Sequence, residues 1–136
     1  MIIMFFRNEY DFLSNFYSCK ITYEGITYKN AEAAFQAQKE CRKTDRIVYS
    51  LVDGRTAKKW GRKAKLKKDW NEIKDNVMYE IVKNKFLQNE ELKIKLKNIK
   101  EEIVEENYWN DTYWGKCNGI GENKLGKILE KVKKEI

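Results

Sequence analysis

The feature that most constrains the fold is a stretch of helical periodicity over residues 69 to about 88. Seven apolar side chains recur there at helical spacing: Trp70, Ile73, Val77, Met78, Ile81, Val82 and Phe86. Because residues three and four apart lie on one side of an α-helix, the pattern predicts a long helix that buries one face. Trp70 falls in its first turn, where it is either a core residue or a side chain that projects over a pocket.

Shorter elements are predicted on both sides of this helix. Residues 2–6 read as a strand, and residues 19–29 as a hairpin with Gly25 at a turn position that needs positive φ. Residues 11–17 mix aromatics with Ser and Asn and are predicted as an ordered loop. Further helices are predicted at 31–42 after an Asn30 cap, around Ile47 after Thr44, around Trp60 after Thr56, at 89–99 and at 125–136, with a short strand at 103–104. The sequence therefore predicts an α+β fold, a mostly helical single domain over residues 1–136 with a small N-terminal antiparallel sheet or hairpin.

The amino-acid composition excludes several kinds of chemistry. The chain has no histidine, which excludes Ser-His-Asp and Cys-His catalysis and the usual His-containing zinc sites. Its three cysteines, Cys19, Cys41 and Cys117, form no CxxC pair and no disulfide framework, as is typical of a reducing cytoplasm. Residues 1–6 are apolar but too short for a signal peptide or a membrane span, so a cytoplasmic protein is expected. Acid–base chemistry must come from Asp, Glu, Lys or Tyr, and we expect no metal.

The formal net charge of +7 favours polyanionic partners, either nucleic acid or phosphorylated small molecules. Positive charge is densest over residues 58–68, which hold Lys58, Lys59, Arg62, Lys63, Lys65, Lys67 and Lys68. We call these seven residues the basic run. Its simpler interpretation is a solvated helix face in a lysine-rich chain.

A stretch near the C-terminus has the composition of a ligand pocket. Asp111 is flanked by three aromatic residues, Trp109, Tyr113 and Trp114. Small and polar residues follow within a dozen positions: Gly115, Gly119, Gly121, Asn123 and Gly126. Flat rings stack flat ligands, glycines let the backbone approach them, and a carboxylate supplies charge or accepts a proton. The alternative is a buried aromatic cluster with a glycine-rich turn before the last helix.

Two earlier segments also carry candidate site residues. Glu32, Gln36 and Lys39 are spaced to share one face of a helix that is otherwise rich in alanine. This stripe faces either a polar cleft or solvent. In the segment before the hairpin, Phe16 could stack on a ligand and Asn15 could hydrogen-bond to it, or the segment is simply a packed connection.

Taken together, these stretches resemble the NADAR family, also called YbiA-like, in the family's order and over nearly the whole chain. The matching pieces are Phe12-Leu-Ser-Asn-Phe-Tyr17, the Ala-Glu-Ala-Ala-Phe-Gln-Ala-Gln-Lys run ending at Lys39, Asp69-Trp70, Val77-Met78, Lys85-Phe86, Val104-Glu105, Asp111-Thr-Tyr-Trp-Gly115 and Gly121-Glu-Asn-Lys-Leu-Gly126. The chain departs from the family at Asn30-Ala31, where many members have Ser/Thr-Val, and at Ala33, where histidine is common.

The resemblance implies an N-glycoside hydrolase that needs no metal or organic cofactor. Substrate classes in the family include phosphorylated riboflavin-pathway intermediates and ADP-ribosylated guanine, free or on nucleic acid. By matching motifs, the family's functional Glu, Trp and Asp fall on Glu32, Trp70 and Asp111, and Lys39 is the motif lysine. Asp111 would stabilise the charged transition state or activate water, with Glu32 as the second acid–base group; these two assignments could be exchanged.

Substrate-binding roles are assigned from the chemistry of the side chains. Trp70 and Trp114, with Phe16, would stack the base or the sugar. Arg7 or Lys39 would hold a phosphate, and Lys39 could alternatively attack C1 through a Schiff base. The predicted substrate-binding set is Arg7, Asn15, Phe16, Trp114, Gly115 and Asn123. Glu32, Trp70, Asp111 and Trp114 are expected to line one concave site. The alternative function is a non-catalytic module that binds nucleotide, ADP-ribose or nucleic acid; neither alternative implies a membrane partner.

Overall fold

The structure is a computed structural model that describes residues 2, 3 and 5–136. By its internal contacts the chain divides into two compact units, and each is described by itself. The central unit is Asn15–Asn89, and the terminal unit combines Met1–Ser14 with Glu90–Ile136.

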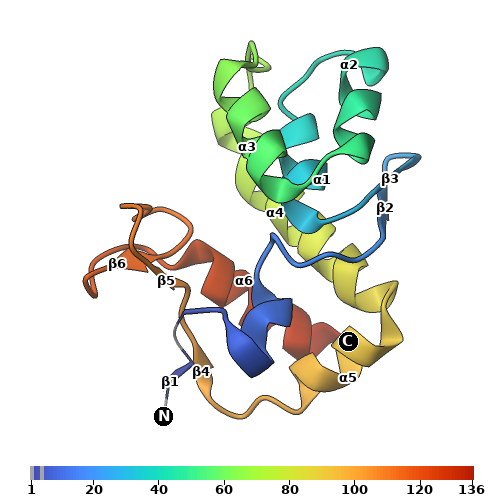
Figure 1. The fold of residues 1–136 in the computed structure, drawn as a ribbon. Coiled ribbons are helices and arrows are strands. Elements are labelled where there is room, and N and C mark those ends of the chain that lie inside the picture. The colour runs from blue at the N-terminus through green and yellow to red at the C-terminus, as the bar shows by residue number, and fades with distance from the viewer. Residues whose placement is uncertain (1, 4) are drawn as a thin grey trace. The chain divides into compact units, whose positions relative to one another are not determined.

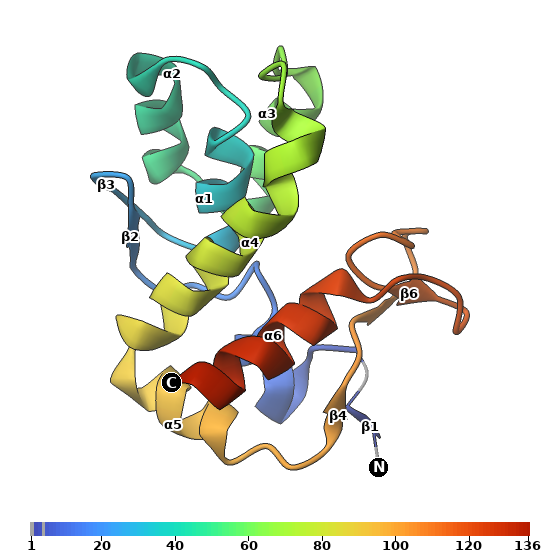
Figure 2. The ribbon, with the colours of Figure 1, turned by 180° about the vertical axis from the view of Figure 1, so that it is seen from behind.

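The central unit is built around α4 (Trp70–Leu87), the long helix expected from the sequence, which begins directly after Asp69. The helix α1 (Ala31–Ala37) packs against α4 and against α3 (Gly54–Lys63). Figures 1 and 2 show these helices from opposite sides. The remaining elements of the unit are β2 (Ile21–Tyr23), β3 (Ile26–Tyr28), α2 (Lys43–Ile47) and the 3₁₀ helix η2 (Val48–Leu51).

The hairpin β2–β3 is antiparallel, as predicted, and pairs Tyr23 with Ile26 beside the turn. Its turn residues Glu24 and Gly25 both have positive φ, 49° and 80°. Two positive φ values in succession define the turn type whose twist matches that of the two strands. The prediction of positive φ at Gly25 is confirmed.

Asn30 caps α1 as predicted, because its Oδ1 accepts a hydrogen bond from the Ala33 amide at 2.7 Å. The helix is shorter than predicted and ends at Ala37. Beyond that point the amides of Lys39 and Glu40 bond to carbonyls three residues back, which tightens the chain out of α-helical geometry. The Gln38 side chain also donates to the Ala34 carbonyl at 2.9 Å.

Two details of the following segment were predicted wrongly. Thr44 lies inside α2 rather than at its cap, and α3 is capped by Asp53, whose Oδ1 accepts a hydrogen bond from the Thr56 amide at 2.8 Å. The pattern after Thr44 also predicts a helix that buries Ile47, Val48 and Leu51, but all three are exposed. Tyr49 is buried in their place, since the chain tightens into a 3₁₀ helix there and changes which side chains share a face.

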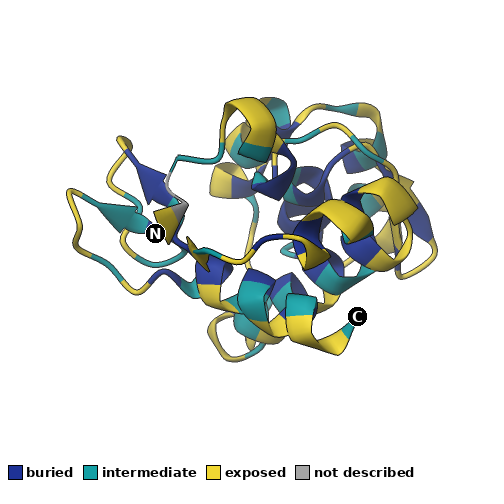
Figure 3. Cartoon of the chain, turned by 90° about the horizontal axis from the view of Figure 1, so that it is seen from below, coloured by how far each residue is buried: buried dark blue, intermediate teal, exposed yellow. Residues whose placement is uncertain are grey.

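The terminal unit holds two helices that pack together, α5 (Glu90–Lys97) and α6 (Lys124–Glu135). Leu125, Leu129 and Val132 form the buried stripe of α6, and Figure 3 shows buried and exposed residues alternating around the helices. Residues 11–13, predicted as loop, belong to the 3₁₀ helix η1 (Asn8–Leu13).

The terminal unit also contains two short parallel strand pairs. The predicted N-terminal strand is present only as β1 (Ile2–Ile3), which pairs with β4 (Glu102–Ile103); Met4, within the predicted range, lies outside the described residues. The second pair joins β5 (Glu106–Asn107) to β6 (Lys116–Cys117). The α+β fold is confirmed, mostly helical and with a small antiparallel hairpin. None of the described helices is long and apolar enough to cross a membrane.

Candidate functional site

Glu32 lies in the first turn of α1 and is half-buried. Its backbone amide donates to the Asn15 carbonyl at 2.9 Å, and its Oε2 accepts a hydrogen bond from Gln36 Nε2 at 2.6 Å. The unsatisfied amides at a helix N-terminus favour a negative charge at this position. The carboxylate is therefore held in one place by its neighbour one turn along the helix.

Lys39 is half-buried and is electrostatically coupled to Glu32. Burial lowers the pKa of Lys39, the Glu32 carboxylate opposes that shift, and three further cations lower the pKa as well: Lys74, Arg62 and Lys58. Gln36, which lies between Glu32 and Lys39 in the sequence, is buried. The predicted stripe is thus a partly buried polar face with one carboxylate among several cations, and not a fully solvated one.

Trp70 is the first residue of α4 and only 4% exposed. Its ring packs against Phe35 of α1, with a centroid distance of 5.2 Å and an interplanar angle of 50°. Of the two interpretations left open, the core position is the one that this structure shows.

Asn15 and Phe16 lie in the same unit but differ in exposure. Asn15 is buried, and its Nδ2 donates to Met78 Sδ at 3.4 Å, so its side chain acts as part of a packed connection. Phe16 is 48% exposed. Its ring lies so close to Gly54 that a side chain at that glycine would overlap it, and Lys58 Nζ is 6.0 Å from the ring centroid. Phe16 therefore presents an aromatic surface beside a cation.

In the terminal unit, Asp111 is half-buried and held in a turn. Its Oδ1 accepts hydrogen bonds from the amides of Tyr113 and Trp114, both at 3.0 Å. The side chain of Asn107 fixes the Asp111 backbone from the other side, accepting from its amide at 3.1 Å and donating to its carbonyl at 2.9 Å. Among the described residues, Asp111 Oδ2 accepts no hydrogen bond.

The Asp111 loop is joined directly to the start of α6. Backbone carbonyls of residues 112–115 accept hydrogen bonds from the amides of residues 122–125, at 2.8 to 3.2 Å. The first amides of a helix have no partner within it, and these carbonyls supply one. The two C-terminal motifs, 111–115 and 121–126, are thus two halves of one hydrogen-bonded structure.

Gly115 and Asn123 have structural surroundings of their own. A side chain at Gly115 would overlap the backbone and side chain of Glu105, so this glycine allows a close approach within the protein. Asn123 has a left-handed φ of 52° and a buried side chain, which accepts from the Glu105 amide at 2.9 Å and donates to the Ile103 carbonyl at 3.0 Å. These contacts account for both residues without a ligand, and their roles in substrate binding stay predictions.

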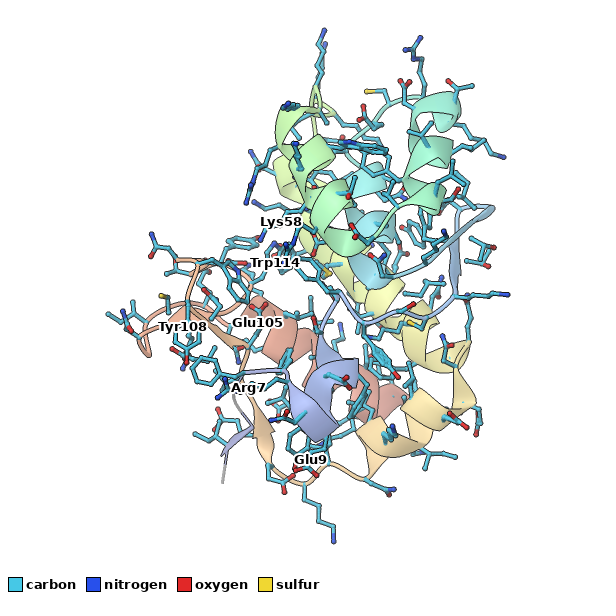
Figure 4. All side chains as sticks on the ribbon, in the orientation of Figure 1. Arg7, Glu9, Lys58, Glu105, Tyr108 and Trp114 are labelled. Atoms are coloured by element: carbon cyan, nitrogen blue, oxygen red, sulfur yellow. The ribbon has the colours of Figure 1, made fainter. Side chains whose placement is uncertain are left out.

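Arg7 belongs to a stack of three side chains in the terminal unit. Its guanidinium lies 4.9 Å from the Phe5 ring centroid, and Phe5 stacks on Tyr108 at 4.8 Å with an interplanar angle of 20°. Figure 4 labels Arg7 and Tyr108. Trp114, also labelled there, meets Tyr113 edge-on at 4.9 Å, and Lys124 Nζ lies 4.7 Å from the Tyr113 ring centroid.

Sequence reasoning missed the residues that hold the candidate carboxylates. Gln36 was noted only as part of the stripe, and Asn107 and Gly61 were not singled out. The i, i+4 spacing of Glu32 and Gln36 was a usable signal. The hydrogen bonds between Asn107 and Asp111 require a turn in the chain that the turn propensities of these residues do not predict. Glu32 and Trp70 lie in the central unit and Asp111 and Trp114 in the terminal unit, so their convergence on one site stays a prediction.

The NADAR domain family model matches residues 4–136, and the chain belongs to the NADAR family. It is 34% identical over 143 residues to the N-glycosidase YbiA of Shigella sonnei, covering 99% of this chain and 88% of that protein. It is 31% identical to the N-glycosidase Npun_R5314 of Nostoc punctiforme, covering 100% of this chain and 93% of that protein.

A longer relative and a solved structure extend the comparison. The riboflavin biosynthesis protein VVA0006 of Vibrio vulnificus is 34% identical over 137 residues, but the chain spans only 36% of its length. The NMR structure of the Escherichia coli protein YbiA superposes with a TM-score of 0.87 at 33% identity, covering 98% of this chain and 83% of that one.

Proposed function

We propose that the protein is an N-glycosidase, a hydrolase that cleaves the bond between a ribose C1 and a nitrogen. The relatives named N-glycosidases support this reaction type. The observation that carries the proposal is the arrangement around Glu32: one half-buried carboxylate held by Gln36 and coupled to Lys39, with Arg62, Lys58 and Lys74 acting on the same lysine.

This arrangement suits a phosphorylated riboside. When the C1–N bond breaks, positive charge develops on the ribose ring, and a fixed carboxylate stabilises it. Water adds to C1, a carboxylate takes its proton, and the departing nitrogen gains one. The surrounding cations can hold a phosphate, which a carboxylate alone would repel.

Glu32 and Asp111 are the two carboxylates to which we assign this chemistry. Asp111 stabilises the charged ring or activates the water, and Glu32 serves as the second acid–base group. Asp111 Oδ1 is occupied by the turn, so Oδ2 is the oxygen that we assign to the reaction.

Two substrate classes fit a flat ring, a ribose and a phosphate: phosphorylated intermediates of riboflavin biosynthesis, and ADP-ribosylated guanine, free or on nucleic acid. The name of the Vibrio vulnificus relative supports the first class. Arg7, Lys39, Phe16, Trp70 and Trp114 are the proposed substrate-contacting residues.

The test is to incubate the purified protein with both classes and detect the released base and ribose product by mass spectrometry. The Glu32→Gln variant should bind substrate but lose turnover by about 10²-fold or more, since general acid–base catalysis contributes about that much. Glu72→Gln is the matched control, because Glu72 is also in the first turn of a helix but is exposed.

A non-catalytic binding module is the alternative function. It predicts ligand binding with no product from either class, and equal behaviour of Glu32→Gln and the wild type. Product from neither class, together with that equality, would refute the enzymatic proposal.

A further inference from the structure

The central unit contains an open cavity of about 550 Å³ that none of the candidate catalytic residues lines. It is formed by residues from α2, η2, α3 and the segment directly after α3, with Glu40 from the segment after α1. The side chains that determine its chemistry are Glu40, Asp45, Tyr49, Trp60, Lys63 and Lys65. The volume lies within the range of about 300–1,000 Å³ that is usual for small-molecule sites.

The cavity and the Glu32 arrangement use different faces of α3. Lys58 and Arg62 act on Lys39, whereas Trp60 and Lys63 line the cavity. Because successive helix residues turn by about 100°, positions 58 and 62 share a side that positions 60 and 63 do not. The basic run therefore contributes to two separate places, and the cavity is not part of the proposed active site.

Trp60 forms the aromatic wall of the cavity. It is 37% exposed, so part of the indole surface is open to a ligand. The buried Tyr49 ring meets it edge-on, at a centroid distance of 5.4 Å and an interplanar angle of 86°. The Tyr49 hydroxyl in turn donates to Glu40 Oε2 at 2.8 Å. The indole thus packs against a tyrosine ring whose hydroxyl is itself hydrogen-bonded.

The two acidic residues of the cavity already have partners. Glu40 accepts the Tyr49 hydroxyl, and Asp45 Oδ2 accepts from Arg42 Nε at 2.9 Å. By contrast, among the residues that the structure describes, neither Lys63 nor Lys65 forms an ion pair. The positive charge of these two lysines is therefore available to a ligand.

We propose that this cavity binds a planar aromatic ligand of mononucleotide size that carries a phosphate or carboxylate group. Its ring stacks on Trp60, and its anionic group contacts Lys63 and Lys65. A single strand of nucleic acid fits less well, because the lining also includes the carboxylates of Glu40 and Asp45, which repel additional phosphates. Charge complementarity thus selects a compact anion over a polyanion.

Binding is tested by isothermal titration calorimetry with AMP as the probe. Adenosine and inorganic phosphate, the two parts of AMP, are titrated separately for comparison. AMP should bind more tightly than either half, because only AMP engages both the indole and the lysines. In a two-dimensional ¹H–¹⁵N spectrum, the Trp60 indole N–H signal, assigned from a Trp60→Phe variant, should shift more than the other three indole signals.

Two charge variants from the basic run locate the site. The double variant Lys63→Gln/Lys65→Gln should weaken AMP binding by about tenfold or more, through loss of charge-assisted hydrogen bonds. The matched control Lys67→Gln/Lys68→Gln removes the same charge from the same run but no residue that lines the cavity. It should change AMP binding by less than a factor of about two, since exposed charges outside direct contact are largely screened.

Trp60→Leu should also abolish stacking. Trp60→Phe keeps an aromatic ring and should retain most of the affinity, and it serves as the test if the leucine variant does not fold. In the Glu32→Gln protein, AMP binding at Trp60 should be unchanged, which separates this site from the proposed active site. Equal weakening by both double variants, tighter binding of a single-stranded oligonucleotide than of AMP, or a shift centred on another indole would each overturn the proposal.

Discussion

At the scale of single residues, the two oxygens of Asp111 have different surroundings. Oδ1 accepts two backbone hydrogen bonds and so builds the turn that ends at Trp114. Oδ2 accepts none from the described residues. The structural role of Asp111 in the turn therefore belongs to Oδ1, and its proposed catalytic role belongs to Oδ2. Separate substitutions can test the two roles.

We expect Asp111→Asn to keep the turn and lose the chemistry. The amide oxygen can accept both backbone hydrogen bonds, while the negative charge is gone. Turnover should fall by about 10²-fold or more, mainly in kcat, with little change in the melting temperature. Asp111→Ala should in addition lose about 1–2 kcal/mol of stability, because the two amides lose their acceptor. A folded Asp111→Asn protein with near-normal kcat would refute the role assigned to the carboxylate.

Lys39 gives a prediction about pH and stability. Burial holds its pKa below the ordinary lysine value, so on lowering the pH the unfolded chain takes up this proton before the folded protein does. The free energy of unfolding should therefore rise as the pH increases from the lowered pKa of Lys39 towards the ordinary value of about 10.4. Below this pH range, the cost of burying the charged Lys39 ammonium should be fully present.

The measurement is urea unfolding of wild type and Lys39→Met across that pH range. The methionine variant lacks the titrating group, so its stability advantage over the wild type should shrink as the pH rises. Lys59→Met, at an exposed position of α3, is the control and should show no such trend. A constant difference between wild type and Lys39→Met would contradict the assignment.

At the scale of elements, the position of Glu32 depends on how closely α3 approaches α1. A side chain at Gly61 of α3 would overlap the Gln36 side chain of α1. Gln36 is buried and donates to Glu32 through Nε2, and its Oε1 has no hydrogen-bond partner among the described residues. Gly61 thus acts as a positioning residue for the amide that holds the carboxylate.

Gly61→Ala should destabilise the protein, although alanine is favoured over glycine in a helix by about 1 kcal/mol. The overlap is with the outer part of the Gln36 side chain, which is buried and hydrogen-bonded to Glu32, so moving it should cost about 1–3 kcal/mol, as at an overpacked core position. In a Gln36→Ala background the overlap is absent, and Gly61→Ala should become neutral or stabilising. Thermal melts of the four proteins measure this reversal; a stabilising Gly61→Ala change in the wild-type background would rule out the close approach.

The same elements show what the sequence could and could not predict. The helix at 70–87 and the turn at Glu24-Gly25 follow from local signals, namely apolar spacing and a glycine that needs positive φ. Leu51, by contrast, was expected to be buried and is 70% exposed. Its apolar character alone does not determine which side of a tight 3₁₀ turn faces the core. Gly115 lies against Glu105, a contact between segments that no local pattern encodes, and its predicted role in substrate binding stays a prediction.

At the scale of the whole molecule, the family assignment spans both units, whereas each candidate carboxylate lies in only one of them. Glu32 is in the central unit and Asp111 in the terminal unit. The enzymatic proposal assigns both carboxylates to the same reaction. Residues that act as a unit in one reaction show strongly non-additive effects on turnover when both are changed.

A double-mutant cycle on kcat tests this. Glu32→Gln and Asp111→Asn should each lower kcat by about 10²-fold or more, and the double variant should lose little beyond the worse single variant, because the first loss already removes the concerted step. Glu72→Gln combined with Asp111→Asn is the matched control, and its effects should add within about 0.5 kcal/mol, as for independent sites. Melting curves of all variants establish that each is folded. If the losses from Glu32→Gln and Asp111→Asn simply multiply, the two carboxylates act independently, which would contradict the joint role assigned to them.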